Sequence, residues 1–289
     1  MILVHLMGGL GNQMFQYAAG KALSTRLNLP LKVHFEDHYQ HAKRNFALEV
    51  FNIKSTFPTP DELNTYLPDR GIKRKLKQLF KLPYQGKLYR EPEIFVLDQG
   101  FFEIASGVYL SGFWQHTGYF DPIETALRDD FTFKNPAKGE NLRVLEAIQS
   151  KPLTCSIHIR RTDYTNPASG LYPLPISYYQ ESVKTLEDTI HQKPNYYIFS
   201  DDADWVQDNF TAVPRARMSI VAHNDGAHAH EDMRLMATCD HHIIANSSFS
   251  WWGAWLNADN DKKLIAPFSW DNSLNSKKSG LFSSNDILL

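Results

Sequence analysis

The chain carries the stretch Cys155-Ser156-Ile157-His158-Ile159-Arg160-Arg161-Thr162-Asp163-Tyr164, in which an apolar run ends on two adjacent arginines. The run predicts a buried strand over 155–159, so both guanidinium groups stand at its carboxyl end. In open α/β sheets, ligands bind beyond the carboxyl ends of the strands, and guanidinium pairs with phosphate through two parallel hydrogen bonds. The stretch therefore predicts a grip for a diphosphate. The alternative is a surface arginine pair held by Asp163.

Strand and helix patterns alternate regularly around this stretch throughout the second half of the chain. Repeated βα units imply a parallel, doubly wound sheet. The expected strands are Cys155–Ile159, Tyr196–Ser200, Met218–Ala222, His242–Ala245 and Leu264–Ala266, and the expected helices are Ile176–Leu186, Ala203–Phe210, Glu231–Cys239 and Ser250–Leu256.

The first half opens in the same way, with a strand over 2–6, a glycine loop, a helix from about Met14 to Leu27 and a strand over 31–35. The loop matches only half of a dinucleotide fingerprint. Gly9 and Gly11 are present, but Met14 stands where a third glycine would allow close helix packing. We therefore expect no nicotinamide cofactor. A further helix begins at the capping box of Thr59 and Glu62.

A chain of 289 residues, 43% of them hydrophobic, suits two modest domains. The sequence becomes polar, with proline and glycine, over residues 134–141. A boundary is expected there or just after the short helix that follows, and we place it after that helix. The predicted domains are residues 1–150 and 151–289.

Four ordered segments give a more specific indication. Gly8-Gly9-Leu10-Gly11-Asn12-Gln13 opens the chain, and the stretch around Arg160 is followed by Phe199-Ser200-Asp201-Asp202 and by Asn246-Ser247-Ser248-Phe249-Ser250-Trp251-Trp252. This set resembles glycosyltransferase family 11, the α-1,2-fucosyltransferases. The resemblance spans nearly the whole chain and extends to Arg44, Phe46, Leu48 and Phe51, and to Gly112-Phe113-Trp114-Gln115 with Tyr119-Phe120.

The resemblance implies an α/β fold of GT-B architecture, with two Rossmann-like domains facing across a cleft. Residues 1–150 would serve mainly the acceptor, and residues 151–289 would bind GDP-fucose. The implied reaction moves L-fucose from GDP-β-L-fucose to the 2-hydroxyl of a terminal β-galactose, with inversion. The donor is a substrate, and no cofactor is expected.

In such an enzyme Arg160 would neutralise the diphosphate as the bond to the sugar breaks, since charge stabilisation at a leaving group contributes several kcal/mol. Arg160 and Asp163 are the expected catalytic pair, with Asp163 fixing an arginine. Arg161 would support them. His158 would orient the loop or touch a phosphate.

The remaining donor-binding predictions lie at the amino ends of helices, where backbone N–H groups favour an anion. Asn246, Ser247, Ser248 and Phe249 form one such turn, for which plain helix capping by serine is the alternative. Asp232 is expected to read the guanine edge, against the alternative of an ordinary exposed acid.

Gly11 and Asn12 belong to the loop that lies against the donor in the wider fucosyltransferase superfamily. Turn formation is the alternative for Asn12. The base that accepts the galactose proton is not identifiable, with Glu36, Asp37, His5 and Asp163 as candidates.

Two patterns could suggest a metal, and we expect none. Asp202 and Asp204 spell D-x-D, but helix capping explains them equally well. His223, His228 and His230 crowd together without a fourth ligand at convincing spacing, so structural or solvated histidines are expected.

The charge balance of 30 basic and 32 acidic residues, net −2, offers no basic field for nucleic acid. Cys155 and Cys239 fit neither a disulfide framework nor a zinc cage. With no secretory signal or membrane span in view, a cytoplasmic bacterial enzyme is expected. The basic amphipathic segment from Arg70 to Leu82 is either a solvated helix or a peripheral contact with the inner membrane, where a lipid-linked glycan acceptor would lie.

Two rival readings stay open. One is a GDP-sugar transferase with another donor or linkage, against which the tryptophan-rich serine turn argues. The other is a catalytically silent nucleotide- or glycan-binding protein, which would hold ligand without turnover.

Overall fold

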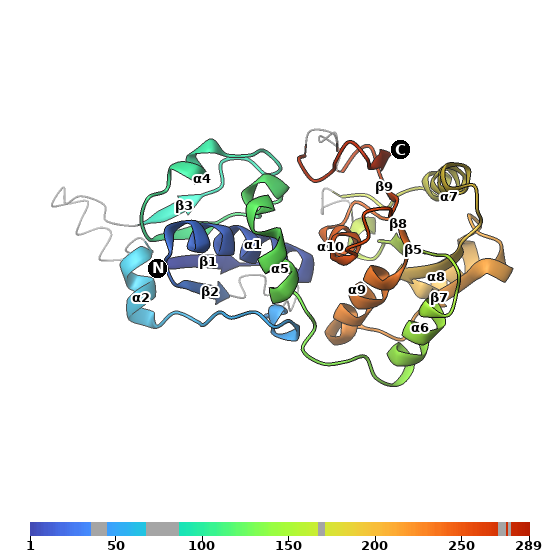
Figure 1. Ribbon diagram of the computed structural model, residues 1–289, viewed down its shortest axis with the longest axis horizontal. Coiled ribbons are helices and arrows are strands. Elements are labelled where there is room, and N and C mark those ends of the chain that lie inside the picture. The colour runs from blue at the N-terminus through green and yellow to red at the C-terminus, as the bar shows by residue number, and fades with distance from the viewer. Residues whose placement is uncertain (36–44, 68–86, 167–170, 271–275, 277–278) are drawn as a thin grey trace. The chain divides into compact units, whose positions relative to one another are not determined.

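The computed structural model describes residues 1–35, 45–67, 87–166, 171–270, 276 and 279–289 (Figure 1). The chain divides into two compact units, Met1–Thr132 and Phe133–Leu289. Each unit contains its own parallel sheet. The prediction of an α/β protein with two Rossmann-like domains, the GT-B class of fold, is confirmed. The basic segment Arg70–Leu82 falls outside the described residues, as do Glu36 and Asp37.

The first unit is built on a four-stranded sheet of order β2-β1-β4-β3. All of its pairings are parallel. The sheet strands are β1 (Ile2–Leu6), β2 (Leu31–Phe35), β3 (Leu88–Arg90) and β4 (Val108–Ser111), and the α-helices are α1 (Leu10–Leu27), α2 (Pro60–Tyr66), α4 (Gln99–Glu103) and α5 (Glu124–Asp130).

The predicted βαβ beginning is confirmed, with α1 packed against β1. The helix begins at Leu10 rather than near Met14, so Gly11 and Asn12 lie in its first turn. The capping box before α2 is also present, since the Thr59 side chain accepts from Glu62 N and the Glu62 carboxylate accepts from Thr59 N.

The second unit has a six-stranded sheet of order β10-β9-β8-β5-β6-β7, again with parallel pairings. Its sheet strands are β5 (Thr154–Ile159), β6 (Asn195–Ser200), β7 (Met218–Val221), β8 (His241–Ile243), β9 (Leu264–Ala266) and β10 (Ile287–Leu288), and its α-helices are α6 (Gly139–Gln149), α7 (Ile176–Ile190), α8 (Ala203–Asn209), α9 (Ala229–Thr238) and α10 (Ser248–Leu256).

The predicted alternation of strands and helices in this half is confirmed. β5 lies in the middle of the sheet between β6 and β8, and all six of its residues are buried. Because the strands are parallel, the residues that follow β5, β6 and β8 meet at one edge of the sheet. This edge carries Arg160, Asp201 and Asn246.

Helix α6 belongs to the second unit, where it packs against α9. A boundary after residue 150, as the sequence predicts, places this helix in the first domain. In the structure the division falls between Thr132 and Phe133, before the polar stretch. The physical reason is a tertiary contact: Asn141 of α6 donates to Asn224 in the loop before α9 at 2.9 Å.

Candidate functional site

Arg160 follows directly on β5 and is fixed by two carboxylates. Its Nε donates to Asp163 Oδ1 at 2.9 Å, and its Nη1 lies 3.1 Å from Asp201 Oδ2. Only 24% of the side chain is exposed. Burial lowers the pKa of Arg160, but the hydrogen bond that Arg160 donates to Asp163 and the charge of Asp201 outweigh burial and hold the pKa above its ordinary value. The guanidinium is therefore a permanent, oriented cation. The predicted contact between Asp163 and an arginine is present.

Asp201, which follows β6, was missed as a site residue and binds the loop that carries Arg160. Its two oxygens accept from the backbone N–H groups of Arg161, at 2.9 Å, and Thr162, at 3.2 Å, and also from the Thr162 hydroxyl. Burial raises the pKa of Asp201, but the charge of Arg160 and these hydrogen bonds outweigh burial and hold the pKa below its ordinary value. The anion thus fixes both the arginine and the loop that carries it.

Arg161 faces a different neighbourhood from Arg160. Its guanidinium carbon lies 3.7 Å from the centre of the Trp205 ring, and its Nε donates to Asp202 Oδ2 at 3.2 Å. Asp202 in turn caps α8 by accepting from Trp205 N at 3.2 Å. The prediction that helix capping explains this aspartate is confirmed. Arg161 is placed by packing on α8.

Histidine and phenylalanine meet beside this loop. His158, with 4% of its surface exposed, lies with its ring centre 5.7 Å from that of Phe249. Burial, followed by the charge of Arg160, lowers the pKa of His158 to about 3. The imidazole is therefore neutral at physiological pH. Within the described residues, its buried Nδ1 has no hydrogen-bond partner.

Tyr164 links the loop after β5 that carries Arg160 and Arg161, the arginine loop, to the turn before α10. The sequence alone gave Tyr164 no role. Its hydroxyl donates to the Asn246 carbonyl at 2.8 Å, and its ring centre lies 5.8 Å from the guanidinium carbon of Arg160. Ser247 is the N-cap residue of α10, and Ser248 and Phe249 lie in the first turn. The structure thus brings together Arg160, Asp163, His158, Asn246, Ser247 and Phe249, all from the predicted set.

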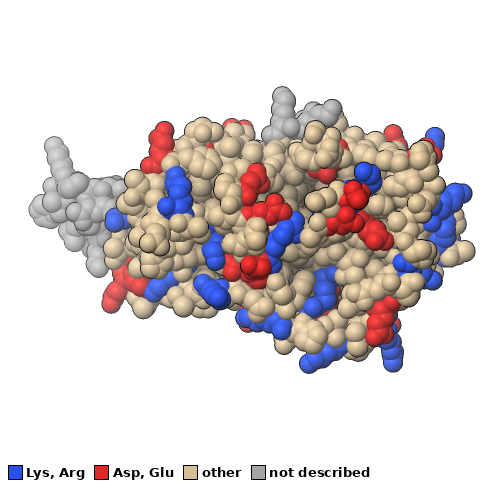
Figure 2. Space-filling model, viewed as in Figure 1, with Lys and Arg blue, Asp and Glu red and all other residues tan. Residues whose placement is uncertain are grey.

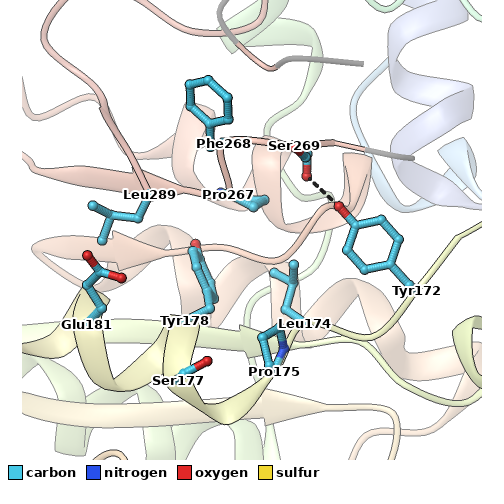
Figure 3. Close-up of a pocket in the computed structure, with 10 residues that line it drawn as sticks. All are labelled: Tyr172, Leu174, Pro175, Ser177, Tyr178, Glu181, Pro267, Phe268, Ser269 and Leu289. Carbon is cyan, nitrogen blue, oxygen red and sulfur yellow. Dashed lines mark hydrogen bonds between the residues drawn. The ribbon is translucent and has the colours of Figure 1, made fainter. Parts of the chain in front are cut away.

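The carboxamide nitrogen of Asn246 donates hydrogen bonds to the backbone of other segments of the second unit. Its Nδ2 donates to the carbonyls of Tyr172, at 3.3 Å, and Trp270, at 3.1 Å. Tyr172 also donates to the carbonyl of Ser269 at 3.2 Å, at one side of a pocket beyond the carboxyl end of β9 (Figure 3). Asn246 therefore ties the wall of this pocket to the turn before α10. The pocket is lined by Tyr172, Leu174, Pro175, Ser177, Tyr178, Glu181, Pro267, Phe268, Ser269 and Leu289.

Asp232 lies in the first turn of α9, at the same edge of the sheet as the other loops. It is half-buried, and its Oδ1 accepts from Asn224 Nδ2 at 2.7 Å. Burial raises the pKa of Asp232 to about 7, against the opposing effect of the Asn224 hydrogen bond. Among the described residues no cation pairs with it. Asp232 is thus not an ordinary exposed acid, and its carboxylate has unused capacity to accept hydrogen bonds.

The three histidines that could suggest a metal have different partners. His223 pairs with Asn141 at 2.7 Å, His228 with Asp225 at 3.2 Å, and His230 lies 3.4 Å from Glu231. Across the part of the chain that the structure describes, no group of three or more His, Cys, Asp and Glu side chains converges on a metal-sized space. These histidines have separate partners.

Gly11 and Asn12 belong to the first unit. Gly11 is buried in α1, and Asn12 Oδ1 accepts from Gln115 Nε2 at 2.8 Å. Of the candidates for the base, Asp163 is engaged with Arg160, and the His5 ring stacks on His34 with centres 6.0 Å apart.

The surface carries charges of both signs. Lys and Arg alternate with Asp and Glu over the visible face in Figure 2. None of the described helices combines the length and the apolar character needed to cross a bilayer.

Comparison with known proteins gives relatives with named activities. The chain is 33% identical to an alpha-1,2-colitosyltransferase of Escherichia coli, over 93% of this chain and 92% of that protein. It is 30% identical to the O-antigen biosynthesis glycosyltransferase WbnK of Escherichia coli, over 94% of this chain and 96% of that protein. It is also 26% identical to galactoside alpha-(1,2)-fucosyltransferase 1 of Ateles belzebuth, over 57% of this chain and 46% of that protein.

Among solved structures, the fold resembles that of NodZ alpha-1,6-fucosyltransferase co-crystallised with GDP. The TM-score is 0.50 at 14% sequence identity, over 88% of this chain and 91% of that one. The family model for glycosyl transferase family 11 matches residues 1–287. With the arginine loop and the serine turn assembled at one edge of a parallel sheet, and with this match over almost its entire length, the chain belongs to glycosyl transferase family 11.

Proposed function

We propose that this glycosyltransferase moves L-fucose from GDP-β-L-fucose to the 2-hydroxyl of a terminal β-galactose, with inversion, and forms an α-1,2 linkage. The motifs shared with the α-1,2-fucosyltransferases support the donor. The names of the Escherichia coli colitosyltransferase and of the galactoside fucosyltransferase support the α-1,2 linkage and the galactose acceptor.

The observation that carries this proposal is the placement of Arg160. Two carboxylates fix its guanidinium at the end of the central strand, beside the turn that opens α10. Within the described residues, Nη2 of Arg160 makes no hydrogen bond, so this end of the guanidinium group is available to a ligand. A half-enclosed guanidinium that meets the charge on departing GDP contributes several kcal/mol, whereas an exposed ion pair contributes under about 1 kcal/mol.

The turn of Ser247, Ser248 and Phe249 would complete the grip on the diphosphate. The first N–H groups of a helix have no acceptors within the helix, and they favour an anion. The neutral His158 would donate or accept a hydrogen bond without adding charge. Asn246 would act through the framework, since its carboxamide nitrogen is bonded to Tyr172 and Trp270. Arg161 would hold the loop on α8.

Asp232 would read the base. A carboxylate accepts from guanine N1–H and N2–H₂ together, an edge that adenine does not offer. The raised pKa and the absence of a cation beside Asp232 among the described residues leave this carboxylate in need of donors. The structural relative that was co-crystallised with GDP supports the choice of nucleotide. Gly11 and Asn12 of the first unit would also contact the donor.

We further propose that no metal or other cofactor takes part. Arginine and the helix amino terminus would supply the positive charge that a cation provides in other sugar transferases. The acceptor would be a galactose-terminated oligosaccharide or a lipid-linked glycan, which the O-antigen role in the name of WbnK supports. A loose, oxocarbenium-like transition state would need only weak help from a base.

A second donor has specific support, because one relative at 33% identity is a colitosyltransferase. Colitose is L-fucose without its 3-hydroxyl. A site built to bond that hydroxyl would reject colitose, whereas an apolar site would accept both sugars.

The deciding experiment offers purified protein GDP-fucose, GDP-colitose, GDP-mannose and ADP-sugar controls together with lactose and other β-galactosides, with linkage analysis of the products by NMR. Fucose on the 2-hydroxyl of galactose is expected. Turnover of GDP-colitose alone would replace the donor assignment, and GDP binding without any transfer would favour the catalytically silent alternative.

A further inference from the structure

The loop between β7 and α9 carries a second residue that bears on the nucleotide, Asn224. β7 ends at Val221 and α9 begins at Ala229, so this loop lies at the carboxyl edge of the second sheet. Asn224 Nδ2 donates to Asp232 Oδ1 at 2.7 Å. The contact lies wholly within the second unit.

Asn224 forms a reciprocal pair with Asn141, in the first turn of α6, the helix that packs against α9. Asn141 Nδ2 donates to Asn224 Oδ1 at 2.9 Å, and Asn224 Nδ2 donates to Asn141 Oδ1 at 2.8 Å. His223 Nε2 lies 2.7 Å from the same Asn141 oxygen. Because a carbonyl oxygen only accepts, His223 donates from Nε2. The Asn141 carboxamide is thus held from two sides.

This network gives the Asn224 amide one orientation. Its nitrogen has two hydrogens, and they go to Asn141 and to Asp232. An ionised carboxylate offers acceptors alone. A reversed Asn224 amide would set its oxygen against the Asp232 carboxylate and its nitrogen against the nitrogen of Asn141. While Asp232 is ionised, the network therefore delivers a hydrogen bond to Asp232 Oδ1.

Asp232 depends on this bond. The side chain is half-buried, and burial raises its pKa while the hydrogen bond from Asn224 lowers it. The neighbouring charge of Glu231 raises the pKa too, and Glu231 itself pairs with Arg234 at 2.8 Å. Among the described residues, Asn224 alone donates to the carboxylate, and Oδ2 makes no hydrogen bond. The bond restrains the carboxylate plane and leaves acceptor capacity on both oxygens.

We propose that Asn224, held by Asn141, is a positioning residue that fixes the plane of the Asp232 carboxylate before guanine binds. The base then meets two oriented oxygens, and less rotational freedom is lost on binding. This inference rests on the proposed function, in which Asp232 reads the guanine edge. Its consequence is specific to the base: Asn224 contributes to the affinity for GDP and not to the affinity for ADP.

The test is calorimetry of GDP and ADP with the full chain and Asn224→Leu. Leucine has nearly the shape of asparagine but cannot donate. The Kd for GDP is expected to rise by about tenfold, the scale of one lost hydrogen bond to a charged group, while the Kd for ADP stays unchanged. In steady-state kinetics the KM for GDP-fucose should rise by a similar factor, with kcat nearly unchanged.

Two further variants sharpen the result. Asn224→Asp keeps an acceptor for Asn141 Nδ2 but sets a second carboxylate against Asp232, so it should weaken GDP binding at least as much as leucine does. Asn224→Leu combined with Asp232→Asn should match Asp232→Asn alone, because Asn224 acts through Asp232. Asn260→Leu, at an exposed asparagine after α10, is the matched control and should change neither affinity. Thermal unfolding reports the fold of each variant.

The positioning role would be overturned, with the proposed function left standing, by a full preference for GDP in both Asn224 variants. Equal weakening of GDP and ADP, or additive effects in the combined variant, would overturn it in the same way. A wild-type protein that binds GDP and ADP equally would overturn this inference together with the base-reading role of Asp232. A preference for GDP without fucose transfer would overturn the proposed reaction alone.

Discussion

The two loops that follow the first strand of each unit are held by opposite means. After β1, neutral carboxamides fix the loop, with Gln13 bonded to backbone groups and Gln115 bonded to Asn12. After β5, charged groups fix the loop, with Arg160 between Asp163 and Asp201. Neutral amides orient a ligand without a strong field, whereas a fixed cation stabilises charge that develops during bond cleavage. From this contrast we expect the first loop to serve positioning and the second to stabilise charge.

The largest expected effect comes from changing Arg160, the cation of the loop after β5, which we call the charged loop. Arg160→Lys keeps the charge but replaces a planar fork by a point charge, so kcat should fall by about 100-fold or more. Arg161→Lys is the matched neighbour and should cost much less, because Arg161 stacks on Trp205 rather than facing the serine turn. Steady-state kinetics with GDP-fucose measure both, with circular dichroism as the folding control. Equal losses in the two variants would contradict the separation of roles.

The next effect concerns the nucleotide. Asp232→Asn should weaken GDP binding by about 1.5–3 kcal/mol and leave the weak binding of ADP unchanged, since a charged acceptor is lost only against guanine. Calorimetry gives both affinities, and Asp208→Asn, an exposed acid on α8, is the control. If GDP and ADP bind equally well to the wild type, the base-reading role is wrong.

The raised pKa of Asp232 gives this prediction a pH dependence. With a pKa of about 7 in the free protein, Asp232 is largely protonated at pH 6, and a protonated carboxyl group cannot accept from both guanine donors. GDP affinity should therefore rise from pH 6 to pH 8 in the wild type and stay flat in Asp232→Asn. A flat wild-type profile would contradict the assignment.

In contrast to GDP affinity, the stability of the unliganded protein should fall as the pH rises. The folded state keeps a proton on Asp232 that the unfolded state releases near pH 4, so this contribution to stability is complete below pH 4 and is lost as pH rises to about 7. The gain in Tm of Asp232→Asn over wild type should therefore grow between pH 4 and pH 7. Thermal unfolding across that range provides the measurement.

A smaller effect is expected for Asp201→Asn. Asparagine keeps one acceptor for the loop but loses the charge that orients Arg160, so kcat should fall by about tenfold, less than for Arg160→Lys. Because the pKa of Asp201 is lowered, its stabilising effect is present at neutral pH and is lost as pH falls through that pKa. Kinetics and acid unfolding of the variant test both points. An unchanged kcat would show that Asp163 alone orients the arginine.

The smallest expected effect is that of chelation. Excess EDTA should leave activity unchanged, because in the proposed mechanism the charged loop and the amino end of α10 take the place of a cation. Complete loss of turnover that manganese or magnesium restores would return Asp202 and Asp204 as ligands. Partial stimulation by magnesium would not, since released GDP binds magnesium and product inhibition is relieved.

Local patterns were sufficient to predict much of this molecule. Alternating apolar segments predicted the βα units of the second half, and the salt bridge between Arg160 and Asp163 spans only three residues along the chain. Asp202 was read correctly as a helix cap, because capping depends on the few residues that follow it. The match of the motifs to glycosyl transferase family 11 is confirmed over residues 1–287.

Features that depend on strand order were not predictable in the same way. The role of Asp201 requires β6 to lie beside β5 with Ile159 opposite Ser200, and that register is a tertiary fact. Tyr164 reaches Asn246 only because β8 flanks β5 on the other side. In the first unit, β3 and β4 are short, and the turn at Trp114, where φ is +56°, depends on Glu91 from a neighbouring strand.

The most direct test of the charged loop is a single-turnover measurement on Arg160→Lys. Enzyme in excess over labelled GDP-fucose, with saturating galactoside acceptor, reports transfer of the bound sugar separately from release of GDP. We expect this rate to fall by about 100-fold while the Kd for GDP changes far less. A single-turnover rate near that of the wild type, or a loss that appears only in Kd, would contradict the claim that Arg160 stabilises charge on the departing diphosphate.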